Sequence, residues 1–96
     1  MEMANVNKVA LFRHITEKMA NTYENKNETY GNSFGIGIQK YGLISALTSM
    51  SDKFHRIEHL ICGGENKVPD ESLKDTLLDL ACYSIMTLIE IDPKFD

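Results

Sequence analysis

The fold depends most on residues 69–92, PDESLKDTLLDLACYSIMTLIEID. The stretch predicts one helix of about six turns, since Asp70 behind Pro69 suits an N-cap and Asp92-Pro93 stops a helix. Its apolar residues form two faces instead of a single stripe. The first face holds Leu73, Leu77, Leu80, Ala81, Ser84, Leu88 and Ile91, and the second holds Leu78, Cys82, Ile85 and Ile89. A helix that is apolar on two sides must be covered on two sides.

The narrow remaining face of this helix carries three carboxylates, Glu71, Asp75 and Asp79, each four residues after the last. Asp79 is the most informative of them because its neighbours are apolar. An ionised carboxylate that is buried without a partner is strongly destabilising, so we expect a cation, an arginine or a network of donors to meet Asp79. For Glu71 and Asp75 the alternative is a solvated acidic face with local salt bridges.

Two further helices are predicted upstream of this one. Residues 4–24 place apolar side chains three and four apart, which is typical of an amphipathic helix. Residues 42–62 form the second helix, which ends at Gly63-Gly64, a left-handed stop. Its apolar seam consists of Leu43, Leu47, Met50, Phe54, Ile57 and Ile61, and the opposite line consists of Ser45, Ser49, Asp52, Arg56 and His59. The seam is typical of an antiparallel bundle, and the small residues opposite would let another helix approach closely.

The segment between these two helices has little helical pattern. Residues 24–42, ENKNETYGNSFGIGIQKYG, are rich in Asn and Gly and predict a loop with one helical turn near residues 36–40. A short strand is the rival interpretation, because Phe34, Ile36 and Ile38 alternate with two glycines.

The same segment holds aromatic residues among small polar ones. Tyr30 and Phe34 are close in sequence to the side-chain donors of Asn32 and Ser33. Aromatic rings can stack on a base or ribose while such donors hold its edge, so these residues predict a nucleotide contact. The alternative is that the rings cover the ends of the helices.

Composition narrows the class of partner. The 96 residues predict a single domain over 1–96, and the net charge of −4 with no run of Lys or Arg argues against duplex nucleic acid. A small basic pocket for one nucleotide remains compatible with this charge. The sequence shows no signal peptide, and Asp79 interrupts the longest apolar run, so we expect a cytoplasmic chain that does not contact a membrane.

The cysteines do not predict a disulfide framework. Cys62 and Cys82 lack a C-x-x-C pairing and are expected to be reduced thiols. His55, His59 and Cys62 fall on one side of the second helix, so a zinc site is an alternative to ordinary surface histidines. No fourth ligand is evident in the sequence.

Basic side chains gather at one place within the predicted helices. Lys53 and Arg56 lie close to Asp52 and can receive phosphate oxygens, Arg through its planar fork of donors. They can also pair with Asp75 and Asp79 across the bundle, and ligand contacts can replace those internal pairs. Two of the three helices carry a second close-packing face, which predicts a homo-oligomer, either a dimer or a larger assembly.

Four stretches of the chain, taken in order, resemble the phage nucleotide-modification-associated domain family over roughly residues 24–90. They are Lys26 with Tyr30-Gly31-Asn32-Ser33-Phe34, Tyr41-Gly42-Leu43, residues 51–57 (SDKFHRI) and residues 70–83 (DESLKDTLLDLACY). The resemblance implies a fold similar to the all-α pyrophosphatases of the MazG and dimeric dUTPase type, in which helices pair between subunits around magnesium. It also implies a role on or around nucleotides, in the host cytoplasm if the chain is phage-encoded.

In those pyrophosphatases an E-E-x-x-E pattern and a second acidic pattern ending in Asp hold magnesium ions that activate water. Asp79 resembles the closing Asp of the second pattern, and Asp75 lies one turn earlier. The first pattern falls on Asp52, Lys53 and Arg56, so two of its three acids are cations in this chain. These cations would repel magnesium, but they can bind phosphate directly.

The leading hypothesis is therefore an all-α protein of three main helices in an antiparallel bundle completed by oligomerisation. It binds, and sequesters, a nucleotide or nucleotide-derived messenger such as one of bacterial immunity, without a cofactor. The residues expected at the ligand are Lys26, Tyr30, Asn32, Ser33, Phe34, Lys53, Arg56, Asp75 and Asp79.

Two alternatives remain open from the sequence. One is a Mg²⁺-dependent nucleoside triphosphate pyrophosphohydrolase, whose metal ligands would be Asp52, Glu71, Asp75 and Asp79. The other is a structural interaction module, in which the two-sided helices serve only to build an oligomer.

Overall fold

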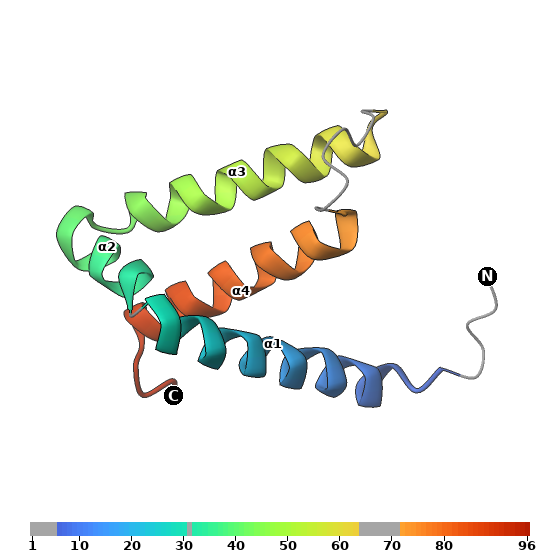
Figure 1. Cartoon of the computed structure of the whole chain (residues 1–96), viewed down its shortest axis with the longest axis horizontal. Coiled ribbons are helices and arrows are strands. Elements are labelled where there is room, and N and C mark those ends of the chain that lie inside the picture. The colour runs from blue at the N-terminus through green and yellow to red at the C-terminus, as the bar shows by residue number, and fades with distance from the viewer. Residues whose placement is uncertain (1–5, 31, 64–71) are drawn as a thin grey trace. The chain divides into compact units, whose positions relative to one another are not determined.

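A computed structural model describes residues 6–30, 32–63 and 72–96, and only the backbone of residues 28–30. Every regular element in these ranges is a helix, so the predicted all-α class is confirmed (Figure 1). The helices are α1 (Lys8–Tyr30), α2 (Ser33–Tyr41), α3 (Ile44–Ile61) and α4 (Leu73–Ile91). Within the described ranges, none of them combines the length and the apolar character that crossing a membrane requires.

The chain divides into two compact units, residues 1–31 and residues 32–96. The first contains α1, and the second contains α2, α3 and α4. Each unit is described by itself. The predicted three-helix bundle therefore stays a prediction, because one of its three helices is α1.

Helix α1 is longer than the sequence pattern indicated. The Asn7 side chain caps its start by accepting a hydrogen bond from the Ala10 N–H at 3.0 Å, and the helix continues to Tyr30 instead of ending near residue 24. The Asn-rich end predicts a loop, but Gly31 is the first glycine of the chain and no proline precedes it. Asn and Lys lower helix propensity only slightly, so nothing before Gly31 terminates the helix.

Helix α2 replaces the predicted loop and excludes the rival strand. Its N-cap is Asn32, whose side chain accepts a hydrogen bond from the Gly35 N–H at 3.3 Å, and it ends at Gly42 with φ +77°. Phe34 and Ile38, four residues apart, are both half-buried, whereas the intervening Ile36 is exposed. The apolar residues of α2 are therefore buried at helical spacing, and the alternation of Phe34, Ile36 and Ile38 does not indicate a strand.

Helices α3 and α4 run antiparallel and side by side, and α2 contacts both near one end of the pair (Figure 1). Helix α3 is followed by Cys62 as its C-cap and by Gly63 at φ +111°, so the predicted glycine stop is confirmed there. Gly37 of α2 lies so close to the Ser45 hydroxyl of α3 that a Cβ at this position would be 3.0 Å from Oγ. A glycine at this position therefore permits the close approach of α2 to α3.

The start of α4 differs from the prediction. Its N-cap is Ser72, and the helix begins at Leu73, whereas Asp70, the expected cap, lies outside the described residues. Ser72 and Asp75 form a capping box, in which each side chain accepts a hydrogen bond from the other residue's backbone N–H. The predicted stop at Asp92 is confirmed, because Asp92 is the C-cap.

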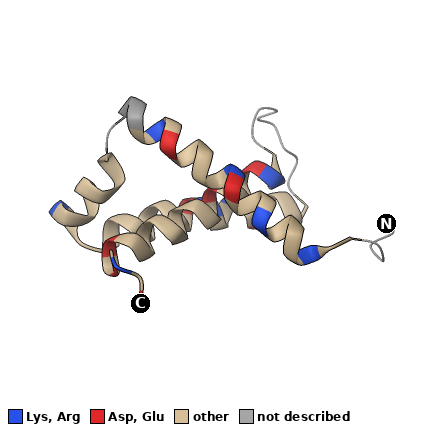
Figure 2. Cartoon of the chain, turned by 90° about the horizontal axis from the view of Figure 1, so that it is seen from below, with Lys and Arg blue, Asp and Glu red and all other residues tan. Residues whose placement is uncertain are grey.

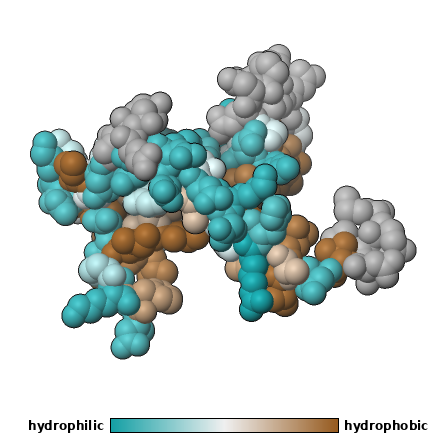
Figure 3. All heavy atoms as spheres, turned by 60° about the horizontal axis from the view of Figure 1, so that its bottom comes forward, coloured by the Kyte–Doolittle hydropathy of each residue, from teal (hydrophilic) through white to brown (hydrophobic). Residues whose placement is uncertain are grey.

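The face of α3 that packs within the unit includes only part of the predicted seam. Ile57 is buried and Met50 half-buried, as the seam predicted, but Ala46 is also buried and Lys53 and Leu60 are half-buried. Four of the seam residues are instead more than half exposed, namely Leu43, Leu47, Phe54 and Ile61. Helix α3 is therefore turned so that polar side chains share its packed face. Figure 3 shows apolar residues of the described helices, coloured brown, among the exposed atoms.

The capping box at Ser72 predicts the effect of removing it. Ser72→Ala loses the side-chain acceptor for the Asp75 N–H, and we expect the free energy of unfolding to fall by about 1 kcal/mol in urea titrations. Ser51→Ala, at an exposed position inside α3, is the control and should leave this free energy nearly unchanged. Equal effects of the two substitutions would contradict the capping role.

Candidate functional site

The candidate site is centred on an ion pair between α3 and α4. The Lys53 Nζ atom lies 2.9 Å from the Asp79 Oδ2 atom. The Lys53 side chain is 22% exposed and the Asp79 side chain 38%. The expectation that a cation meets Asp79 is therefore confirmed, and the cation is a lysine on the packed face of the neighbouring helix.

Arg56 adds a second cation to the same helix. It lies three residues after Lys53, so its backbone is about one turn further along α3. The side chain is half-buried, and its Nε atom is buried. A guanidinium carries five N–H donors in a planar fork, which makes it well suited to two oxygens of one phosphate.

Hydroxyl groups accompany these charges along both helices. Thr76, three residues before Asp79 on α4, is completely buried, and its Oγ1 donates a hydrogen bond to the Ser72 carbonyl at 2.8 Å. Ser49, four residues before Lys53 on α3, is half-buried and donates from Oγ to the Ser45 carbonyl at 3.4 Å. The packed faces of α3 and α4 are thus unusually polar for a helix pair.

An aromatic pair lies further along the same face of α4. Tyr83, four residues after Asp79, stacks on Phe34 of α2, with the ring centroids 5.5 Å apart and the planes at 17°. This contact favours the alternative that Phe34 covers the end of the helices, because its ring is already engaged. It also connects α2 to the helix that carries Asp79.

The structure brings together only some of the residues predicted at the ligand. Lys53, Arg56 and Asp79 occupy the packed faces of α3 and α4, and Phe34 is linked to α4 through Tyr83. Asn32 caps α2, and Ser33 is the exposed first residue of that helix.

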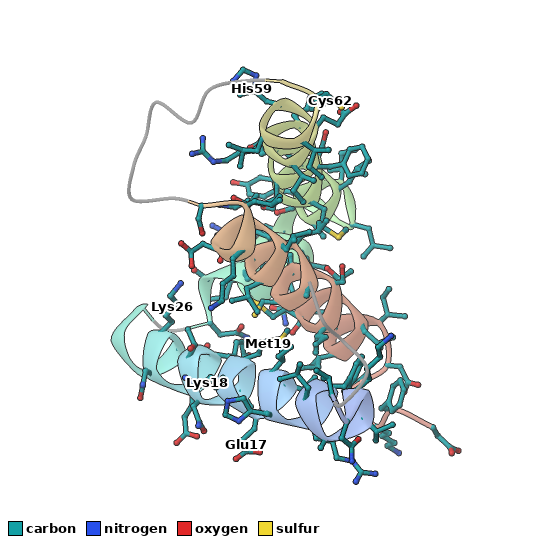
Figure 4. The ribbon with its side chains drawn as sticks, turned by 90° about the vertical axis from the view of Figure 1, so that its right-hand side faces the viewer. Glu17, Lys18, Met19, Lys26, His59 and Cys62 are labelled. Atoms are coloured by element: carbon teal, nitrogen blue, oxygen red, sulfur yellow. The ribbon has the colours of Figure 1, made fainter. Side chains whose placement is uncertain are left out.

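Three other predicted residues lie elsewhere in the chain or outside its described part. Lys26 is an exposed residue of α1, in the other unit (Figure 4). Tyr30 is described only by its backbone. Asp75 is exposed and belongs to the capping box, where its Oδ2 accepts a hydrogen bond from the Ser72 hydroxyl at 2.9 Å.

The residues proposed as metal ligands do not assemble within the described ranges. Asp52 is exposed on α3, and Glu71 lies outside the described residues. Across residues 6–30, 32–63 and 72–96, no three His, Cys, Asp or Glu side chains are grouped closely enough to hold a metal ion. His59 and Cys62 are exposed at the end of α3 (Figure 4). Cys62 and Cys82 form no disulfide.

Sequence reasoning missed two residues of the site, Thr76 and Tyr83. Both follow from Asp79 at helical spacing, because residues three before and four after it share its face. The narrow polar face predicted for this helix held only carboxylates. Extending that face to hydroxyl-bearing residues at the same spacing would have included both residues.

A family model matches the part of the chain that contains this site. The model for nucleotide modification associated domain 1 matches residues 26–91. The chain belongs to this family. In this nucleotide modification associated domain, the matched range includes all of α2, α3 and α4, and therefore both partners of the ion pair. Comparison with curated proteins and with solved structures returned no match.

The charged residues of this domain are spread over its helices. Figure 2 shows acidic and basic residues scattered over the described helices, with no basic stripe along any of them. Lys53 and Arg56 place two cations on the packed side of α3, and Asp79 of α4 meets Lys53 there.

A double-mutant cycle measures the ion pair. We expect Lys53→Met and Asp79→Asn to show a coupling free energy of about 1 kcal/mol in chemical denaturation, because both groups are only partly exposed. The control cycle combines Lys53→Met with Asp52→Asn, an exposed carboxylate adjacent in sequence, and should show a coupling close to zero. Similar coupling in both cycles would mean that Lys53 has no preference for Asp79.

Proposed function

We propose that this nucleotide modification associated domain binds a nucleotide or nucleotide-derived ligand through Lys53 and Arg56. The observation that carries the proposal is the placement of the two half-buried cations on the packed, polar face of α3, with Lys53 held by Asp79. Such an arrangement keeps cations in place without a ligand. The family description adds that the role concerns nucleotides.

The proposed binding step is an exchange of partners. A phosphate group carries more negative charge than a carboxylate and offers more acceptor oxygens, so it can replace Asp79 as the partner of Lys53. The pair is partly exposed, and pairs of this kind contribute about 1 kcal/mol or less, so breaking it costs little. Arg56 would bind two further oxygens through its fork, and Asp79 would then be available to a ribose hydroxyl.

The proposal favours binding over hydrolysis. In the proposed relation to MazG-type pyrophosphatases, Lys53 and Arg56 stand where those enzymes have acids that hold magnesium. A cation at such a position binds phosphate but does not generate a hydroxide nucleophile. The ligand would then be retained unchanged, as in a protein that sequesters a nucleotide messenger.

Isothermal titration calorimetry tests the proposal directly. A panel of nucleoside mono- and triphosphates and cyclic dinucleotides should include at least one that binds the wild-type chain. Lys53→Met and Arg56→Met should each weaken that binding by about 10- to 100-fold, the range expected for losing a hydrogen bond to a charged group. Lys40→Met, an exposed cation in the last turn of α2, is the control and should bind like the wild type. No heat with any member of the panel would reject the proposal.

Asp79→Asn distinguishes nucleotide binding from nucleotide hydrolysis. Asparagine keeps an oxygen that can accept from a ribose hydroxyl but carries no charge to pair with Lys53. If phosphate displaces Asp79 from Lys53, Asp79→Asn should therefore tighten binding by about three- to fivefold, because the competing pair is lost. A magnesium-dependent pyrophosphohydrolase would respond in the opposite way. Its release of pyrophosphate in the presence of Mg²⁺ would disappear in Asp79→Asn, and that result would replace the binding proposal by hydrolysis.

A further inference from the structure

An aromatic stack lies one helical turn from the ion pair of Lys53 with Asp79. Tyr83 follows Asp79 by four residues on α4, so the two side chains are neighbours on one face of the helix. The Tyr83 ring stacks on Phe34 of α2, with the centroids 5.5 Å apart and the planes at 17°. Both residues are half-buried. A paired cation and a pair of stacked rings therefore occupy consecutive turns along α4.

These two contacts correspond to the two ends of a nucleotide. The Asp79 carboxylate presents oxygens to the Lys53 ammonium, as a phosphate would. The Phe34 ring presents a flat π face to Tyr83, as a base would. Side chains on consecutive turns of one helix are about 5–6 Å apart at Cβ, a spacing that the single ribose between a base and its 5′-phosphate can bridge.

The two stacked rings stand on helices of unequal stability. Tyr83 lies in the middle of α4, a helix of 19 residues. Phe34 lies in α2, which has 9 residues and contains Gly35 and Gly37. A helix this short is marginal on its own, and each internal glycine lowers its stability further. Phe34 is therefore the ring that can be displaced at the lower cost.

Only the first turn of α2 has to move for the Phe34 ring to leave its partner. Phe34 is the second residue of the helix, and Asn32 caps this turn through a hydrogen bond of 3.3 Å from a backbone N–H, longer than is usual for such a bond. The N–H groups of a first turn have no intrahelical acceptor, so this turn opens most easily. Gly37, where α2 approaches Ser45 of α3, lies beyond the first turn and can stay in place.

We propose that Tyr83 is the base-binding residue of the site, and that the base of the ligand replaces the Phe34 ring on it. The inference rests on the proposed nucleotide binding at Lys53 and Arg56, and it names the part of the ligand that those cations leave undetermined. Recognition is through the face of the base, which purines and pyrimidines share. The ligand class is thus a 5′-nucleotide with either kind of base, and a sugar phosphate without a base is excluded.

Calorimetry with AMP, UMP and ribose 5-phosphate tests the base contact. AMP and UMP should bind the wild-type chain within about fivefold of each other, and ribose 5-phosphate should bind about 10-fold or more weakly, since it lacks the stacking base. Tyr83→Leu should weaken AMP binding to the level of ribose 5-phosphate and leave ribose 5-phosphate unchanged. Tyr83→Phe, which keeps the ring, should bind AMP like the wild type, as should the control Tyr41→Leu at an exposed tyrosine of α2.

Phe34→Leu tests whether the base replaces the Phe34 ring. Leucine keeps apolar cover on α4 but does not stack, so AMP should bind about two- to fivefold more tightly once it no longer competes with an aromatic ring for Tyr83. In NMR spectra the base protons of AMP should shift upfield on binding, through the ring current of Tyr83. This shift should persist in Phe34→Leu and disappear in Tyr83→Leu, and thermal melting should show that both variants are folded.

The outcomes distinguish this inference from the proposed function. Equal binding of AMP and ribose 5-phosphate by the wild-type chain would overturn the base contact, as would AMP binding that Tyr83→Leu leaves intact. In either case, binding that depends on Lys53 and Arg56 would still support the phosphate site. Weaker AMP binding in Phe34→Leu would overturn the replacement of the ring. No heat with AMP, UMP or any other nucleotide of the panel would overturn the inference and the proposed function together.

Discussion

The ion pair between Lys53 and Asp79 is the contact on which the proposed site depends. Asp79 lies in an apolar stretch of α4 and its side chain is 38% exposed, so it meets solvent as well as the Lys53 ammonium. Charged and hydroxyl-bearing side chains therefore share the packed face of α3 with buried apolar ones, Ala46 and Ile57. Leu47, Phe54 and Ile61 are more than half exposed.

This arrangement has consequences for both stability and function. Polar contacts between helices add little net stability, because each group gives up its interaction with water to form them. They can, however, be exchanged for contacts to an anion at small cost, which an apolar interface cannot offer. An exchangeable polar contact within the packed helix pair is therefore what the proposed ligand site uses.

Local signals in the sequence were sufficient for much of the architecture. The helical class, the glycine stop after α3 and the end of α4 at Asp92 were all predicted correctly, because caps and breakers act on neighbouring residues. Helix α2 was predicted only as one helical turn near residues 36–40, since its N-cap Asn32 stands in a segment where Asn and Gly favour a loop. The cap at Ser72 was displaced by two residues, an error typical of helix boundaries.

The sequence alone predicted a cationic or donor partner for the carboxylate of Asp79 and indicated Lys53 and Arg56 as candidate cations. Periodicity showed which side chains share a face of a helix, but not which face turns inward. That choice, together with the selection of Lys53 at 2.9 Å and the stacking of Phe34 on Tyr83, arose only in the folded chain. The physical reason is that such contacts join residues far apart in sequence, so their energies depend on how whole helices rotate and pack against one another.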